Sequence, residues 1–183
     1  MRKLVIILFL AIMLVGCSLA NKSEKVGSVD KEKEQQAIAM QLLRADEGNG
    51  VTLENEMYQQ LTGLVEANPD IGVADDFSIH PIDLVDTKAG ESVLLFLGIN
   101  RLEKPIKNIK FEYTSGVETE GSVDYVFDRE EVDLSESFAG IIQPGHAIPF
   151  TIPVNEKGEA LFQLMTEENK IVKLENATFE LEE

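Results

Sequence analysis

The only thiol in the chain belongs to Cys17, which follows almost directly on the apolar run of residues 4–15. A single cysteine excludes an intrachain disulfide and a cysteine-based zinc site, because both need more than one sulfur atom. Two histidines, His80 and His146, provide little material for a transition-metal site. The position of Cys17 is therefore the informative feature, and the residues before it indicate its role.

Residues 1–17 have the organisation of a secretory signal sequence. Arg2 and Lys3 are basic, and residues 4–15 are all apolar. This run is too short to span a bilayer, which takes about 20 apolar residues, but it has the usual length of a signal-peptide hydrophobic region. Gly16 is small, as a cleavage site requires. The alternative is an unmodified, buried cysteine at the end of an ordinary signal or anchor helix.

The tetrapeptide Leu14-Val15-Gly16-Cys17 resembles the lipobox of bacterial lipoproteins. The resemblance implies that Cys17 receives a thioether-linked diacylglycerol and that cleavage between Gly16 and Cys17 removes residues 1–16. Two acyl chains hold a protein stably on a bilayer, since each buried methylene contributes about 0.8 kcal/mol. We therefore expect a protein anchored by lipid to the cell membrane, facing the outside of the cytoplasmic membrane, with the bilayer as its partner through acylated Cys17.

The chain is strongly acidic, with 33 Asp and Glu against 16 Lys and Arg and a formal charge of -17. Loss of residues 1–16 would leave 14 basic residues against the same 33 acids, a charge of about -19. Such a domain is repelled by phosphate backbones, which argues against nucleic-acid binding. It is also repelled by anionic lipid head groups, so a covalent or hydrophobic anchor has to hold it at a membrane.

A complete catalytic constellation is not recognisable in the sequence. Serines occur without a G-x-S-x-G motif, and there is no phosphate-binding or dinucleotide fingerprint. A serine triad would have to use His80, which precedes Pro81 in a predicted strand, or His146, which follows Pro144-Gly145 in a predicted turn. Both histidines are expected to be structural or at the surface. We therefore predict no catalytic residue, no cofactor and no enzymatic activity.

Acidic side chains crowd the stretch YVFDREEVDLSE. Calcium takes six to eight oxygen ligands, and carboxylates at alternating positions supply several of them. The EF-hand pattern is absent, however, and no glycine stands near the middle of the run. We expect a solvated acidic loop, with a weak calcium site as the alternative. The carboxylates of this acidic run, counting Asp124 directly before the stretch, are Asp124, Asp128, Glu130, Glu131, Asp133 and Glu136, of which Asp124, Asp128, Glu130 and Asp133 are the calcium candidates.

Three regions follow the signal sequence. Residues 17–36, which begin with the lipidated cysteine, are polar after it and predict a flexible tether. Residues 37–70 predict a helical segment. The helical pattern of the first helix covers residues 30–46 and so begins before this segment. The second helix begins at Thr52 as N-cap and ends at Asn68. The apolar faces of these helices either cover the core or bind a partner, and the sequence leaves both open. Residues 75–183 have a period of two and many turn signals, which indicate strands.

The strand signals predict a mainly β domain with an antiparallel β-sandwich of seven or eight short strands. Pro149 and Pro153 within one of the strands require an edge position or a bulge. The predicted strands cover residues 77–85, 92–100, 106–114, 122–127, 138–142, 147–154, 160–165 and 172–181.

This β region resembles the immunoglobulin-like domains of bacterial surface lipoproteins. The resemblance rests on the strand at residues 94–100, which ends in Asn100, on the turn at Lys104-Pro105 and on the alternating strand after it. Residues 144–150 resemble the turn and apolar strand found late in such domains. The chain has no tryptophan and lacks the Cys–Trp–Cys framework of antibody domains. The resemblance implies an immunoglobulin-like fold and does not indicate an activity.

Two classes of function fit these observations best. The first is a non-enzymatic cell-envelope lipoprotein, anchored at Cys17, whose β-sandwich binds an envelope protein or another envelope component. The second is an accessory subunit of a transporter or envelope enzyme that binds calcium or a small ligand. A hydrolase is a third and weaker hypothesis.

Overall fold

The structure is a computed structural model that describes residues 37–87 and 89–183. The chain divides into two units, Met1–Lys33 and Glu34–Glu183, and all the described residues belong to the second. The signal sequence, Cys17 and the tether lie outside the described residues. The first predicted helix is covered only from residue 37 onward.

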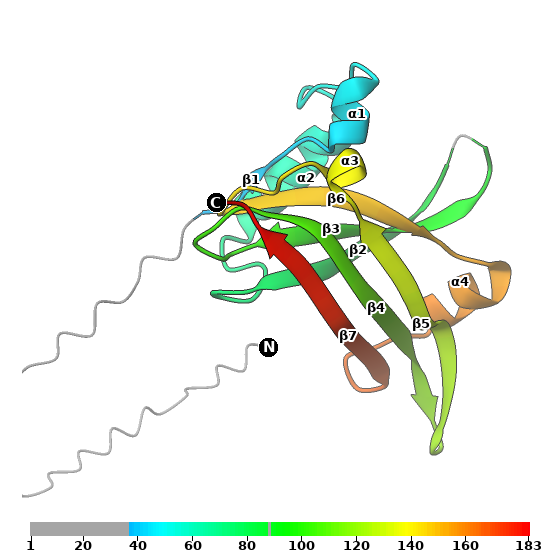
Figure 1. Ribbon diagram of the computed structural model, residues 1–183. Helices are drawn as coiled ribbons and strands as arrows, with labels where there is room; N and C mark the ends of the chain where they lie inside the picture. The colour runs from blue at the N-terminus through cyan, green and yellow to red at the C-terminus, as the bar shows by residue number, and fades with distance from the viewer. Residues whose placement is uncertain (1–36, 88) are drawn as a thin grey trace, which may run out of the picture. The chain divides into compact units, whose positions relative to one another are not determined.

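Strands dominate the described unit, and they form two sheets with the orders β1-β6-β3-β2 and β5-β4-β7 (Figure 1). Except for the parallel pair β1–β6, all neighbouring strands are antiparallel. The elements in chain order are β1 (Ala39–Met40), α1 (Arg44–Gly48), α2 (Glu56–Ala67), β2 (Phe77–Asp86), β3 (Ser92–Asn100), β4 (Ile106–Thr119), β5 (Ser122–Leu134), α3 (Glu136–Ala139), β6 (His146–Pro153), α4 (Glu156–Phe162) and β7 (Lys170–Leu181).

Strand β3 is buried on both of its faces. Leu94 and Phe96 point into the core between the two sheets, while Leu95, Leu97 and Ile99 belong to a second core beneath helix α2. A strand covered on both sides reads as a continuous apolar run instead of an alternating one, which explains the sequence SVLLFLGIN. The domain therefore has three layers, α2, the four-stranded sheet and the three-stranded sheet.

Aromatic side chains fill the space between the two sheets. Phe96 stacks on Phe150 with ring centroids 5.1 Å apart, and it meets Tyr113 of the opposite sheet edge-on at 5.2 Å. Phe111 lies edge-on to Phe150 at 6.2 Å. Such pairs add about 0.5–1.5 kcal/mol each beyond the burial of their area. This shared core confirms the predicted mainly β sandwich.

The immunoglobulin-like topology stays a prediction. The two sheets have four and three strands, as in a constant-type immunoglobulin domain. The fourth place in the larger sheet, however, is occupied by β1, a two-residue strand from the N-terminal side that runs parallel to β6.

Helix α2 packs on the outer face of the four-stranded sheet through Tyr58, Leu61 and Val65. The second predicted helix is therefore confirmed, and its apolar face covers core. The predicted N-cap, Thr52, was wrong. The N-cap is Asn55, whose side chain accepts a hydrogen bond from Met57 N at 3.0 Å.

The hydroxyl of Tyr58 connects α2 to the residues before it. It accepts a hydrogen bond from Leu43 N at 3.1 Å and donates one to Asp46 at 2.7 Å. Burial raises the pKa of Tyr58, so it stays a neutral donor that ties α1 to α2.

The prediction of a helix over residues 30–46 was wrong for residues 37–43 and is confirmed only for residues 44–46, which belong to α1. Residues 37–43 are extended, and only α1 is helical. Ile38 and Met40 are buried and Ala39 is exposed, so the burial has a period of two. Pairing of Ala39 and Met40 with β6 overrides the local helical pattern. The predicted helical segment 37–70 thus contains a strand, a short helix and one full helix.

Two of the eight predicted strands were also wrong. Residues 138–142 begin inside helix α3 and end with Ile142, which forms only an isolated bridge to Ile106. Residues 160–165 overlap helix α4, whose cap Asn155 accepts from Gly158 N at 2.9 Å. The other six predicted strands are confirmed as β2 to β7, and β4 and β5 are longer than expected.

The two prolines of β6 face an open edge. Val154 N donates to Ser92 O, so the odd-numbered residues of β6 direct their backbone N–H positions away from β3. On that side β1 pairs only with His146 and Ala147. Pro149 and Pro153 therefore remove no bond of the sheet, which agrees with the predicted edge position.

Candidate functional site

The two histidines lie on different strands, His80 on β2 and His146 at the start of β6, with β3 between them. His146 Nδ1 is 2.9 Å from the carbonyl oxygen of Pro144, which fixes its ring in the turn before β6. His80 lies beside a pocket of about 430 Å³ lined by Leu64, Ala67, Asn68, Pro69, Asp70 and Ile71. Partial removal from water, and then the charge of Lys170, lowers the pKa of His80. The structure does not bring the two histidines together.

The acidic run is a strand, so the prediction of an acidic loop was wrong. Asp124 and Asp133 stand nine residues apart on β5, roughly 30 Å along an extended chain. Asp124 pairs with Lys157 at 3.3 Å, and Asp133 pairs with Lys110 at 2.9 Å. Residues 128–131 are exposed in succession, because the alternation of β5 is interrupted where Arg129 has a φ of 56° and the register against β4 shifts.

The calcium candidates are not brought together. Asp124, Asp128, Glu130 and Asp133 are distributed along β5. Among residues 37–87 and 89–183 there is no group of three His, Cys, Asp or Glu side chains that could hold a metal ion. Glu131, on the same strand, lies opposite Glu112 of β4.

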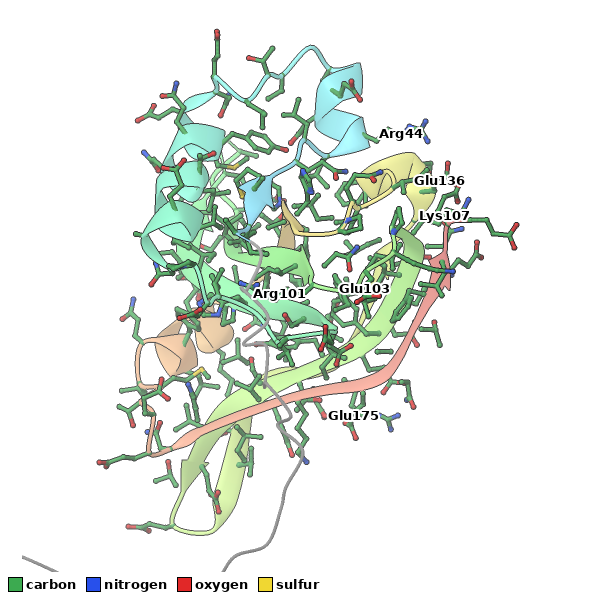
Figure 2. The ribbon with its side chains drawn as sticks, turned by 90° about the vertical axis from the view of Figure 1, so that its left-hand side faces the viewer. Arg44, Arg101, Glu103, Lys107, Glu136 and Glu175 are labelled. Carbon is green, nitrogen blue, oxygen red and sulfur yellow. The ribbon has the colours of Figure 1, made fainter. Side chains whose placement is uncertain are left out.

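A network of ion pairs engages Glu136, the last acid of the run. Glu136 is 3.3 Å from Arg44 and 3.4 Å from Lys107, and Lys107 is 2.5 Å from Glu182. Figure 2 shows Arg44, Glu136 and Lys107 close together at one end of the molecule. The hydrogen bonds to Glu182 and then Glu136 raise the pKa of Lys107. The network joins α1, α3, β4 and the segment after β7, so the role of Glu136 is structural.

The open side between β5 and β6 forms a groove of about 250 Å³, which we call the β5–β6 groove. Its floor is apolar, with contributions from Val132, Leu134, Phe150 and Ile152. Phe138 of α3 also lines it and is 38% exposed. The acidic side chains that line it are Glu130, Glu131 and Asp133.

Both strands beside the β5–β6 groove have a free edge there, since β5 pairs only with β4 and β6 is without a partner beyond Ala147 among the described residues. Pro149 and Pro153 lack the N–H that a further strand would need, which guards β6 against strand addition. The groove therefore suits an inserted side chain better than an added strand.

Sequence reasoning found the acids of this groove but not the groove itself. Phe138 was predicted to lie in a strand, and residues 150–153 were predicted to be part of the strand over residues 147–154. The signal that was available is Phe138, an aromatic residue shortly after Ser135, which precedes α3 directly.

Comparison of the chain with protein-family models, with curated proteins and with solved structures found no match. In the described part of the chain, no helix has the length and apolar character needed to cross a membrane.

Proposed function

We propose that this protein is a non-enzymatic cell-envelope lipoprotein, anchored through a lipid on Cys17, whose β-sandwich binds a protein or another envelope component. The observation that carries the proposal is Leu14-Val15-Gly16-Cys17 at the end of a short apolar run with a basic start. The polar residues 18–36 would separate the anchor from the domain. The anchor is also consistent with the charge of the domain, which by itself opposes contact with an anionic membrane.

The β5–β6 groove is the surface on which we place the partner. Its floor accepts an apolar side chain, and Phe138 offers an aromatic contact that is only partly covered. The carboxylates of Glu130 and Glu131 favour a basic residue next to that apolar side chain. The partner segment would thus carry an apolar anchor flanked by Lys or Arg.

Cys17→Ala should abolish lipid attachment completely, because the thioether needs the sulfur atom. Labelling cells with radioactive fatty acid measures this directly, and the mass of the product reports whether the chain is cut after Gly16. Ser18→Ala is the matched control and should keep both label and cleavage. Membrane fractionation alone would be a poorer readout, since an uncut apolar run can also hold the chain on the membrane. Label retained in Cys17→Ala would refute the proposal.

A photoreactive amino acid at position 138 should crosslink the partner in intact cells. The same probe at Leu164, which is 61% exposed on the segment after α4, is the control and should give no such product. Reversing the charge with Glu130→Lys and Glu131→Lys should reduce the product severalfold, because a basic partner segment is then repelled. Equal crosslinking from both positions would contradict a specific groove.

The pocket beside His80 favours the second candidate, an accessory subunit that binds a small ligand. A ligand seated there would raise the melting temperature. Changes at Phe138 would leave this effect intact, which separates the two functions.

A further inference from the structure

We infer that β7 is an interface for a second copy of this chain: two β7 strands pair antiparallel and join the two three-stranded sheets into one. Strand β7 has twelve residues and lies at the edge of its sheet. Within the described residues it pairs only with β4. Three of its apolar side chains are well exposed, Val172 by 46%, Phe179 by 37% and Leu181 by 50%. A long edge of this kind is a template for another strand.

The free backbone groups of β7 can be located from its bonds to β4. Glu118 N donates to Asn169 O at one end of β7, and Glu182 N donates to Pro105 O at the other. Because antiparallel strands alternate bonded and non-bonded pairs, Val172 and Leu174 direct their N–H and C=O groups to the open edge, and so do Phe179 and Leu181. Leu174 lies opposite Tyr113 and Leu181 opposite Ile106, so these side chains face the core side of the sheet.

A bulge in the middle of β7 allows the first half of the strand in one copy to pair with the second half in the other copy. Asn176 has a φ of 53°, and the register against β4 shifts by one residue there. With a two-fold axis through this bulge, Leu174 of one copy lies opposite Phe179 of the other, and Val172 lies opposite Leu181. The backbone groups of these four residues point to the open edge of β7. The register that pairs their apolar side chains is therefore also the register in which their N–H and C=O groups bond to the second copy.

The charges on the other face of β7 are complementary in that register. Lys173 lies opposite Glu180 of the second copy, and each pair occurs twice. Lys173 has no ion-pair partner among the described residues, whereas Glu180 accepts a hydrogen bond from Asn108 at 3.1 Å. Opposite charges across a strand pair contribute roughly 0.2–1 kcal/mol each, and like charges cost a similar amount. Parallel pairing would place lysine beside lysine, so the charges select the antiparallel arrangement.

The other outer edges of the two sheets do not share these properties. Strand β5 carries Asp124, Asp128, Glu130, Glu131 and Asp133 with a single basic residue, so a second copy would place acid against acid. In β2, Pro81 lacks the N–H donor that an added strand would need. Both are devices that prevent strand addition. Self-pairing is therefore specific to β7.

The test is a charge exchange followed by sedimentation equilibrium of the full chain in density-matched detergent. The wild type should be dimeric. Lys173→Glu and Glu180→Lys should each weaken the dimer by about fourfold or more, since each change turns two opposite-charge pairs into two like-charge pairs. An equimolar mixture of the two variants should restore a dimer, because every pair between the different copies is then opposite in charge. Within one chain these positions are too far apart on the strand to compensate each other.

Lys157→Glu is the matched control, because it makes the same charge change on α4 and should leave the dimer unaffected. Circular-dichroism melting checks that each variant folds. If Glu180→Lys does not fold, the loss of dimer in Lys173→Glu, measured against the wild type and the control, decides the test. A monomeric wild type at about 100 µM, or a dimer that Lys173→Glu leaves unchanged, would overturn the inference.

Discussion

Asn100→Leu should lower the free energy of unfolding by about 4 kcal/mol. Asn100 is completely buried at the end of β3, where Nδ2 donates to Lys104 O at 3.0 Å and to Ile142 O at 2.9 Å. Its Oδ1 accepts from Leu102 N at 3.0 Å. Leucine fills a similar volume but makes none of these three bonds; Ile142 O keeps its bond from Ile106 N, whereas Leu102 N and Lys104 O lose the bond to Asn100. Each lost bond costs about 0.5–1.5 kcal/mol, and a buried group left unpaired costs about 1–3 kcal/mol. Urea denaturation followed by fluorescence or circular dichroism measures the loss.

Asn68→Leu is the matched control for this measurement. The side chain of Asn68 also donates to a backbone carbonyl, that of Leu64 at 2.8 Å, but it lies at the exposed end of α2. Water replaces that bond when it is lost, so the expected change is below about 1 kcal/mol. Equal effects of the two substitutions would mean that Asn100 does not hold the turn between β3 and β4.

Gly116→Ala is expected to destabilise the protein by at least about 3 kcal/mol. A Cβ atom at this position would lie 2.5 Å from the carbonyl oxygen of Asp124 and 3.1 Å from the Cα of Tyr125. Both atoms belong to the backbone of β5, so relief of the clash requires the two longest strands to separate. Overpacking against movable side chains costs about 1–3 kcal/mol, and a rigid backbone costs more. The drop in melting temperature and the slope of urea unfolding report it.

Gly63→Ala is expected to change the stability in the opposite direction in the same assay. Gly63 lies within α2, and nothing stands within 4 Å of its Cβ position. Alanine is favoured over glycine in a helix by about 0.5–1 kcal/mol, so this variant should be slightly more stable than the wild type. If both glycine substitutions raised the melting temperature, the close approach of β4 and β5 at Gly116 would be wrong.

Gly116 also illustrates why part of the fold was not predictable from sequence. The dipeptide Ser115-Gly116 is a local turn signal, and we predicted a break there. In the structure β4 continues through it to Thr119, because glycine permits the close contact with β5. In contrast, β3 was predicted to the residue, since its long apolar run has few alternatives.

The remaining differences have the same origin, which is pairing between residues far apart in the chain. The helical pattern around Ile38 was overridden by β6, which lies more than 100 residues later. The candidate groove combines β5 with Phe138 and β6, and no local pattern shows that these meet. The N-terminal signal is different, because the lipobox resemblance depends only on consecutive residues. Location is therefore the part of the function that sequence addresses best.

The short strand β1 has a mechanical consequence for a protein held at its N-terminal end. With the proposed anchor at Cys17, tension along the chain would reach the described fold first at β1, which is attached by its parallel pairing with β6 and by two bonds of the Gln41 side chain, to Ile141 O and from Gln143 N. These bonds should yield before the buried β3. Release of residues 37–43 would add up to about 23 Å of reach at about 3.3 Å per residue, until the bond from Leu43 N to Tyr58 bears the load. Under load, strand β1 should therefore detach first and lengthen the chain between Cys17 and the domain before the two sheets separate.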